Sequence, residues 1–269
     1  MDINEYVKKL DELFATGRVN EVEEYLLNGI RDGKSRGDTS LLLLAHNELV
    51  GYYRSVGKFD EALSHADCAL KILKDNGLYG TLHYATTLLN TATAMRGKKM
   101  YEDSLRLYQE ALDIFENQLD ENDYRIAGLY NNMSIVHENM GELQKAKDCL
   151  LRAIDIIRKN PEAFVELATS YVNLAQIEFS LGEDEKAQQD TDTALGIFED
   201  HNATKDMHYS AALATAALSC YRKKDYDSSI RYYEAALDTL ESVVGKNDYY
   251  YVLLDNLEEV KNAKRRSET

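Results

Sequence analysis

Asparagine side chains recur in this sequence with a period of about 42 residues. Three of them occupy one equivalent position and two occupy the position just before it. These are Asn90, Asn132 and Asn173, and then Asn47 and Asn131. An asparagine amide carries a donor and an acceptor, as a peptide bond does, so a row of such amides holds an extended peptide by its backbone. The spacing predicts a peptide-binding surface; the alternative is that these amides bond to neighbouring helices or to water.

Two arginines share a further position of the same period, Arg54 and Arg96, 42 residues apart. A guanidinium group presents parallel N–H donors that fit a carboxylate in a bidentate manner. This pair predicts recognition of an acidic side chain or a C-terminal carboxylate near the N-terminal half of the binding surface. The simpler interpretation is that both arginines are solvated or paired with glutamates of this chain.

Residues arranged for catalysis are missing from the sequence. The six histidines form no HExxH, HxH or Cys/His cluster, and the sequence contains no GxGxxG, Walker A or GxSxG motif. Its 47 acidic residues provide no reason to select any particular pair as catalytic. We therefore expect a protein that is not an enzyme and that has no cofactor or metal.

The elements that position these side chains follow from an internal repeat. Small residues recur 41 or 42 residues apart, at Ala62, Ser104, Ala146, Ala187 and Ser229. Seven residues after each comes an alanine, at Ala69, Ala111, Ala153, Ala194 and Ala236. Spacings of 3, 4 and 7 residues place side chains on one helical face, with small residues where helices approach closely. Each copy is predicted to be the second helix of an antiparallel pair.

The repeat resembles the tetratricopeptide repeat, most clearly in NNMSIVHENMGELQKAKDCLLRAI, which begins at Asn131. The usual period of that family is about 34 residues, so the repeats are closer to the longer ones of kinesin light chains. Departures occur where Lys99 and Lys224 replace a turn glycine and where Ser104 and Ser229 replace alanine. The resemblance implies an all-α solenoid, a right-handed superhelix of helix pairs whose first helices line a concave groove.

The repeats extend over nearly the whole chain, and we expect a single solenoid domain over residues 1–269. A degenerate repeat is expected first, because Gly17 and Val22 match the turn glycine and the small residue. A polar capping helix is expected last. The intervals are 1–37 for the degenerate repeat, then 38–79, 80–121, 122–160, 161–203 and 204–245, and 246–266 for the capping helix.

Composition limits the partners. A formal net charge of −16 argues against a nucleic-acid or membrane partner, since both select clustered basic residues. Protein or peptide partners remain. Three scattered cysteines, without metal-ligand spacing, are expected to be buried thiols in a reducing, cytoplasmic environment.

Three functions fit these features. The first is a non-catalytic scaffold that binds a protein or peptide in the groove. The second is a regulatory or sensor region of a larger enzyme or transcription regulator that responds to a peptide signal. The third is a self-assembly module in which tyrosine-rich ends pair between chains, although the tyrosines are better explained by helix packing.

Overall fold

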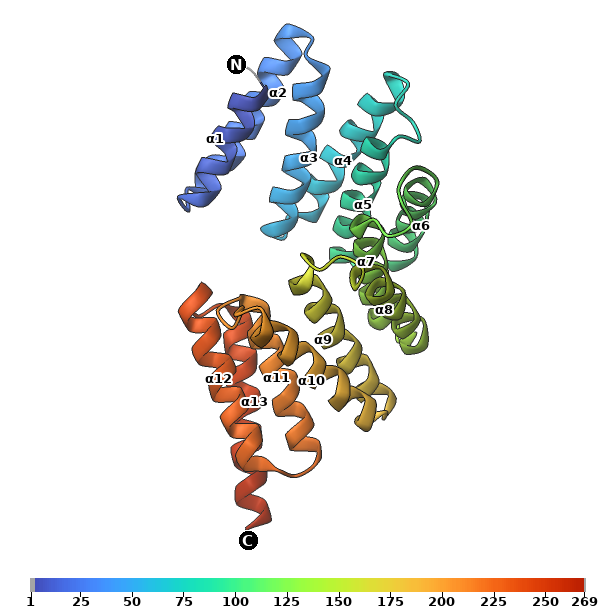
Figure 1. Ribbon diagram of the computed structural model, residues 1–269. Coiled ribbons are helices and arrows are strands. Elements are labelled where there is room, and N and C mark those ends of the chain that lie inside the picture. Colours follow the sequence, from blue (N-terminus) through green and yellow to red (C-terminus); the bar gives the residue numbers. More distant parts are fainter. Residues whose placement is uncertain (1–2, 269) are drawn as a thin grey trace. The chain divides into compact units, whose positions relative to one another are not determined.

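The computed structural model describes residues 3–268 and is built from α-helices throughout this range (Figure 1). Thirteen helices and no strands occur in the described residues, and within each compact unit consecutive helices pack against each other. The predicted fold class, an α-solenoid of helix pairs, is confirmed. The chain divides into two compact units, Met1–Asp120 and Glu121–Thr269. A single domain that includes both units stays a prediction.

The N-terminal unit contains three helix pairs. The first pair corresponds to the degenerate repeat, and the other two lie within the intervals 38–79 and 80–121. The helices are α1 (Ile3–Ala15), α2 (Val19–Arg36), α3 (Thr39–Ser55), α4 (Phe59–Asp75), α5 (Leu82–Gly97) and α6 (Tyr101–Gln118).

The C-terminal unit contains three further pairs and one last helix, which corresponds to the expected cap. These helices are α7 (Tyr124–Asn139), α8 (Leu143–Ile157), α9 (Phe164–Leu181), α10 (Asp184–Asp200), α11 (Met207–Arg222), α12 (Tyr226–Val244) and α13 (Asp248–Ser267). Two lysines of α13 form ion pairs with α12, Lys261 with Glu234 at 2.9 Å and Lys264 with Asp227 at 2.5 Å.

Each corner between the two helices of a pair is made by one residue with a left-handed backbone. Glycine does this at Gly57, Gly141 and Gly182, with φ of 73°, 76° and 77°. Glycine adopts this conformation without steric cost. Lys99 and Lys224, with φ of 63° and 61°, keep the same geometry although they are not glycines. The left-handed backbone of the corner residue is therefore set by its position in the repeat. At Lys99 and Lys224 this conformation is strained, because the residue is not glycine.

The small residues of the second helices are closed to solvent, as the periodicity predicts. The residues at 62, 104, 146, 187 and 229 each have 0 % relative exposure. Ser104 donates a hydrogen bond from its hydroxyl to the carbonyl of Ala92 at 2.7 Å, and Ser229 donates to Ala217 at 2.8 Å. Serine therefore replaces alanine where its hydroxyl reaches a carbonyl of the preceding helix, so the buried hydroxyl itself is satisfied.

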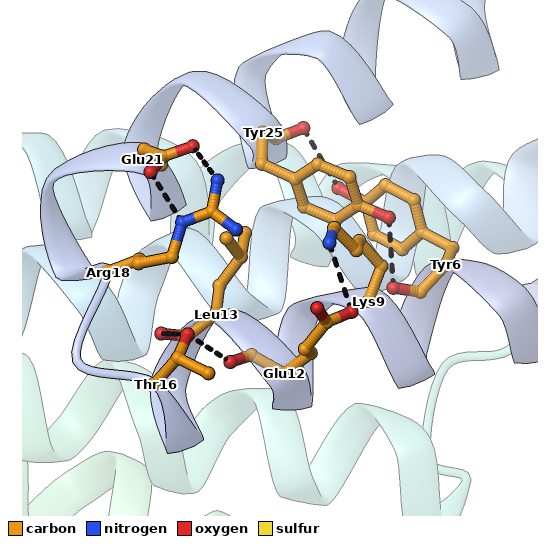
Figure 2. A network of polar contacts seen from close by, with 8 residues as sticks. All are labelled: Tyr6, Lys9, Glu12, Leu13, Thr16, Arg18, Glu21 and Tyr25. Carbon is orange, nitrogen blue, oxygen red and sulfur yellow. Dashed lines mark hydrogen bonds and ion pairs between the residues drawn. The ribbon is translucent and has the colours of Figure 1, made fainter.

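The α1–α2 pair is joined by two tyrosines that exchange hydrogen bonds (Figure 2). The Tyr6 hydroxyl donates to the carbonyl of Tyr25 at 3.3 Å, and the Tyr25 hydroxyl donates to the carbonyl of Tyr6 at 3.0 Å. Their rings stack with centroids 4.6 Å apart. A Cβ atom at Gly29 would lie 2.2 Å from the Tyr6 hydroxyl oxygen, so glycine is needed there for this packing.

One pair of neighbouring first helices is in direct contact in each unit. In the N-terminal unit α3 contacts α5 directly, and in the C-terminal unit α9 contacts α11 directly. In the described part of the chain, consecutive second helices have at most marginal contacts with each other. In a curved stack of helix pairs, the helices that lie closer to their equivalents in the next pair are on the concave side. We therefore take the first helices to present the inward, concave surface of each unit.

The expectation of three buried cysteines was wrong for Cys68, whose side chain is exposed, while Cys149 and Cys220 are half-buried. All three are free thiols. The buried face of α4 is formed by Ala62, Ala66, Ala69 and Leu73, and Cys68 lies outside that stripe. Sequence periodicity contained this information, because residue 68 does not match the 3-4 spacing of the buried positions.

Candidate functional site

Arg54 and Arg96 lie at the C-terminal ends of α3 and α5, and both side chains are half-buried. Burial lowers the pKa of Arg54, and the like charge of Arg96 adds to that effect. The two guanidinium groups therefore lie close enough to repel each other. Among the described residues, the side chain of Arg54 forms no ion pair or hydrogen bond. The structure thus brings together the two arginines that the sequence placed in one register.

A tyrosine that sequence reasoning did not select lies beside this pair. Tyr108 of α6 is fully buried, and its hydroxyl oxygen lies 2.8 Å from the hydroxyl of Thr93 on α5. Burial raises the pKa of Tyr108, and the positive charges of Arg96 and Arg54 oppose this shift. Three helices therefore converge on one spot that combines two cations with a buried hydroxyl pair. The hydroxyl of Thr93 donates to the carbonyl of Leu89, so the guanidinium groups are the donors that suit an oxyanion.

Asn47 and Asn90 lie on α3 and α5 of the same unit, and both are half-buried. Neither forms a hydrogen bond to any described residue, and the Oδ1 atom of Asn47 is buried without a partner. Asn47 shares a face of α3 with Gly51 and Arg54, four and seven residues later. A Cβ atom at Gly51 would meet no atom within 4 Å. This face therefore offers free amide groups beside open space.

The three asparagines of the C-terminal unit differ from each other. The Asn131 amide donates to the Ser170 hydroxyl on α9 at 3.0 Å, and that hydroxyl donates back to Asn131 at 3.2 Å. The Asn132 amide donates to the carbonyl of Gly128 in its own helix at 2.9 Å. Asn173 is half-buried and forms no hydrogen bond within the described chain. Asn131 thus joins two helices, whereas Asn173 remains available.

The register of Arg54 and Arg96 carries other chemistry in the C-terminal unit. It holds Glu138, whose pKa is raised by burial, and Phe179, whose ring lies 5.5 Å from the guanidinium carbon of Arg222. Arg222 also forms an ion pair with Asp184 at 2.8 Å. The basic character of this register is therefore confined to the N-terminal unit, and Arg222 is engaged by its own helices.

A group of charges is enclosed between α8, α9 and α10. Lys147 lies 2.8 Å from Oε1 of Glu178 and 2.5 Å from Oε2 of Glu183. The other oxygen of Glu178, Oε2, is buried without a hydrogen-bond partner. Burial, together with Glu178, raises the pKa of Asp190 to about 7. These groups are partly closed to water, and they join three helices through charge.

No group of three or more histidine, cysteine, aspartate or glutamate side chains suited to a metal ion occurs in residues 3–268. The histidines that do interact are engaged in packing. His46 and His65 share a hydrogen bond between their Nδ1 atoms at 2.9 Å, and His137 lies 2.7 Å from Glu142. Within the same residues, no helix combines the length and the apolar character that crossing a membrane requires.

Antiparallel helix pairs that recur with a fixed period and stack on one another define a helical-repeat protein. The sequence matches the tetratricopeptide repeat family over residues 41–117 and 125–200, and the chain belongs to that family. No curated protein matches the sequence significantly.

Solved structures show the same fold at low sequence identity. BtubC (BKLC) from P. vanneervenii is 24% identical, with 74% of this chain and 81% of that chain covered and a TM-score of 0.67. A putative kinesin light chain from Podosopora anserina is 14% identical, with 76% and 97% covered and a TM-score of 0.62. The STAND protein PH0952 from Pyrococcus horikoshii, with its tetratricopeptide repeat sensor, is 13% identical, with 94% and 41% covered and a TM-score of 0.68.

Proposed function

We propose that the chain is a non-catalytic, cytoplasmic scaffold that binds a protein segment or peptide on the inward surface of its first helices. Arg54 and Arg96 bind a carboxylate of that ligand, either an acidic side chain or a C-terminus. Asn47, Asn90 and Asn173 bind its backbone. Asn131 and Asn132, whose amides already have partners, support the surface rather than contact the ligand.

The observation that carries this proposal is that the Arg54 side chain is half-buried without a counter-charge. The chain has 47 acidic and 31 basic residues, so acidic partners are abundant. Arg54 is nevertheless half-buried, beside another arginine, and none of the described carboxylates pairs with it. Burying a cation without a counter-charge is costly. A carboxylate delivered by a ligand would offset that cost, because it would neutralise the guanidinium group of Arg54.

The neighbouring amides and glycine support a ligand backbone at the same place. Glycine in a helix interior costs roughly 1 kcal/mol relative to alanine, yet nothing packs on Gly51. Open space there, between Asn47 and Arg54, permits a close approach of another backbone. Three or four hydrogen bonds of about 1 kcal/mol each, with one bidentate carboxylate contact, give roughly micromolar affinity.

A peptide panel tests the proposal. Fluorescence anisotropy would compare fluorescent random peptides that end in a free carboxylate with matched peptides that end in an amide, and separately peptides with and without acidic side chains. We expect micromolar binding of at least one carboxylate-bearing class, weakened about tenfold by Arg54→Gln or Arg96→Gln. Arg106→Gln on α6, which removes an exposed arginine paired with Asp103 at 2.7 Å, is the matched control. Equal binding by all four proteins would contradict the proposal.

A regulatory role is the second candidate, and one observation favours it. The fold is similar to that of a protein whose tetratricopeptide repeats are described as a sensor, although the identity of 13% supports only the fold. Such a role requires that ligand binding changes the state of an attached domain. Sequencing the complete reading frame around the gene is the test, because a frame that encodes no further domain would contradict this candidate.

Self-assembly is the third candidate. Apolar side chains are exposed on the first and last helices, at Ile3, Val7 and Phe14 of α1 and at Tyr251, Val252 and Leu254 of α13. Exposed apolar side chains of this kind favour association when they form one patch. Light scattering from micromolar to millimolar concentration is the test, and a constant monomer mass would eliminate this candidate.

A further inference from the structure

A small pocket in the C-terminal unit lies among α11, α12 and α13. It has a volume of about 160 Å³ and is lined by Leu218 and Tyr221 of α11, Tyr233 of α12, and Asn256, Glu259 and Val260 of α13. Pockets for whole small-molecule ligands usually occupy about 300 to 1,000 Å³. This pocket therefore has room for a single side chain.

The polar side chains that line this pocket form no hydrogen bond or ion pair with residues 3–268. Tyr233 is 5% exposed, and its hydroxyl forms no hydrogen bond with any described residue. Among the residues at 3–268, Tyr221, Asn256 and Glu259 likewise form no hydrogen bond or ion pair through their polar atoms. The nearby lysines of α13 are directed to α12, where Lys261 contacts Glu234 and Lys264 contacts Asp227. The Tyr233 hydroxyl lines the pocket and is not among the oxygen atoms that are buried without a partner, so it is open to an occupant of the pocket.

The pocket is the repeat equivalent of the arginine site in the N-terminal unit. Tyr233 corresponds to Tyr108, and Tyr221 corresponds to Arg96; each pair is separated by 125 residues, which is three repeats. The buried tyrosine is retained, whereas an arginine is replaced by an aromatic ring. The last helix then adds Asn256 and Glu259, three residues apart and so on one face of α13. The site is therefore positively charged in the N-terminal unit, through Arg96, and negatively charged in the C-terminal unit, through Glu259 of the last helix.

The chemistry of the lining selects one class of occupant. Glu259 is exposed at the edge of the pocket, so its carboxylate would repel a carboxylate ligand and attract a cation. An apolar side chain would displace water from Asn256 and the two hydroxyls without replacing their hydrogen bonds. A cation satisfies all of them. Its N–H groups donate to the Glu259 carboxylate and the Asn256 carbonyl oxygen, and the rings of Tyr221 and Tyr233 offer cation–π contact.

We propose that this pocket binds a lysine or arginine side chain of a peptide that occupies the inward surface. The inference rests on the proposed function, because it assigns a second contact to the same ligand. The C-terminal unit would select a basic residue, while the arginine pair of the N-terminal unit would select a carboxylate.

The test uses single amino-acid probes, so that it does not depend on finding the natural ligand. The full chain would be titrated with N-acetyl-arginine methylamide, N-acetyl-lysine methylamide and the neutral N-acetyl-citrulline methylamide, and observed through tyrosine ring resonances by NMR. We expect saturable, millimolar binding of a cationic probe with shifts at Tyr233, and at least about tenfold weaker binding of the citrulline probe.

Two variants with the same change of charge decide whether Glu259 is responsible. Glu259→Gln is expected to weaken binding of the cationic probe about tenfold, and Glu258→Gln, beside it on α13, is expected to leave it within about twofold. Equal losses in both variants would show only a long-range charge effect and would overturn the proposal. Absence of saturable shifts at Tyr233, or equal binding of all three probes, would also overturn it.

The experiments distinguish failure of the peptide-binding scaffold from failure of the cation-binding pocket. Arg54→Gln is expected to leave probe binding unchanged, because Arg54 belongs to the other unit. Probe binding in a protein that binds no peptide would support the pocket and contradict the scaffold. Tyr233→Phe keeps the buried ring and serves as a fold control, since its circular dichroism should match that of the original protein.

Discussion

The ammonium group of Lys147 lies 2.8 Å from Oε1 of Glu178, and these two side chains are 9% and 3% exposed. Separating such a pair by mutation leaves an uncompensated buried charge. The second oxygen of Glu178 has no hydrogen-bond donor. Burial, together with Glu178, raises the pKa of Asp190, so a proton on Asp190 keeps a second negative charge away from Glu178. The pair therefore depends on the protonation of a third residue.

This dependence predicts a loss of stability as the pH rises. The folded-state pKa of Asp190, about 7, is above the unfolded value of roughly 3.9. A raised folded-state pKa means that the native state holds the proton more tightly. The stabilisation is complete below about pH 4 and is lost as the pH rises through about 7. We expect a decline on the order of 1 to 2 kcal/mol, given partial screening by water.

Urea denaturation at several pH values between 5 and 8 measures this decline, and Asp190→Asn provides the comparison. The variant should lack the Asp190 contribution, so the difference between the two curves should grow with pH. His46, whose pKa is lowered by burial to about 4, contributes equally to both proteins and cancels in the difference. Parallel curves would show that Asp190 does not hold the proton.

Replacing Arg54 should separate stability from binding. Arg54→Met removes a half-buried charge without a partner and keeps most of the apolar stem. We expect the free energy of unfolding without ligand to rise by about 0.5 to 1 kcal/mol, while peptide affinity falls. Thermal and chemical denaturation measure the first effect, and anisotropy measures the second. A variant destabilised by more than about 1 kcal/mol would assign Arg54 a structural role instead.

The corner lysines should be improved by glycine. Lys99→Gly and Lys224→Gly relieve a left-handed backbone at φ of 63° and 61°. We expect each to raise the free energy of unfolding by about 0.5 to 1 kcal/mol, after allowing for the greater freedom of glycine in the unfolded chain. Neighbouring Lys98 and Lys223 have ordinary φ of −81° and −82°. Glycine at either of these positions should lower the free energy of unfolding. If glycine at 98 or 223 stabilised the protein more than glycine at 99 or 224, the assignment of strain would be contradicted.

Two helical glycines should respond to alanine in opposite directions. A Cβ atom at Gly97 would lie 2.2 Å from Cε1 of Phe59, so Gly97→Ala forces the ring to move and should cost about 1 to 3 kcal/mol. Gly51 faces open space, so Gly51→Ala should stabilise the protein by up to about 1 kcal/mol. If Gly51 admits a ligand backbone, the same variant should weaken peptide binding. Denaturation and anisotropy of both variants provide the measurements.

The helix pairs were predictable because their determinants are local and periodic. The corner residues Gly57 and Lys99 and the small residues Ala62 and Ser104 recur at a fixed spacing, so one alignment located them all. Lys99 was visible only as a departure from glycine. Its left-handed backbone follows from the register and shows that position in the repeat outweighed residue preference.

The side-chain partners within the site were less predictable. Asn131 shared a register with Asn47, but its bond to Ser170 depends on which residue the next first helix places opposite it. Tyr108 was not selected because its register position holds Ala66 and Leu150 in the adjacent repeats, and tyrosine returns there only three repeats later, at Tyr233. The period of the repeat shows which residues occupy equivalent positions. The partner of each side chain depends on the residue that the next helix places opposite it, and that residue differs between repeats.

The left-handed corners also bear on how the chain folds. Each corner lets a helix pack on the helix that follows it within some 40 residues, as Ser104 packs on Ala92. Native contacts are therefore close in sequence, and low contact order is associated with fast folding. Folding of such a chain starts in any helix pair and spreads to its neighbours. A substitution that disrupts one corner would then slow the folding of that helix pair. The pairs on either side would still begin to fold on their own.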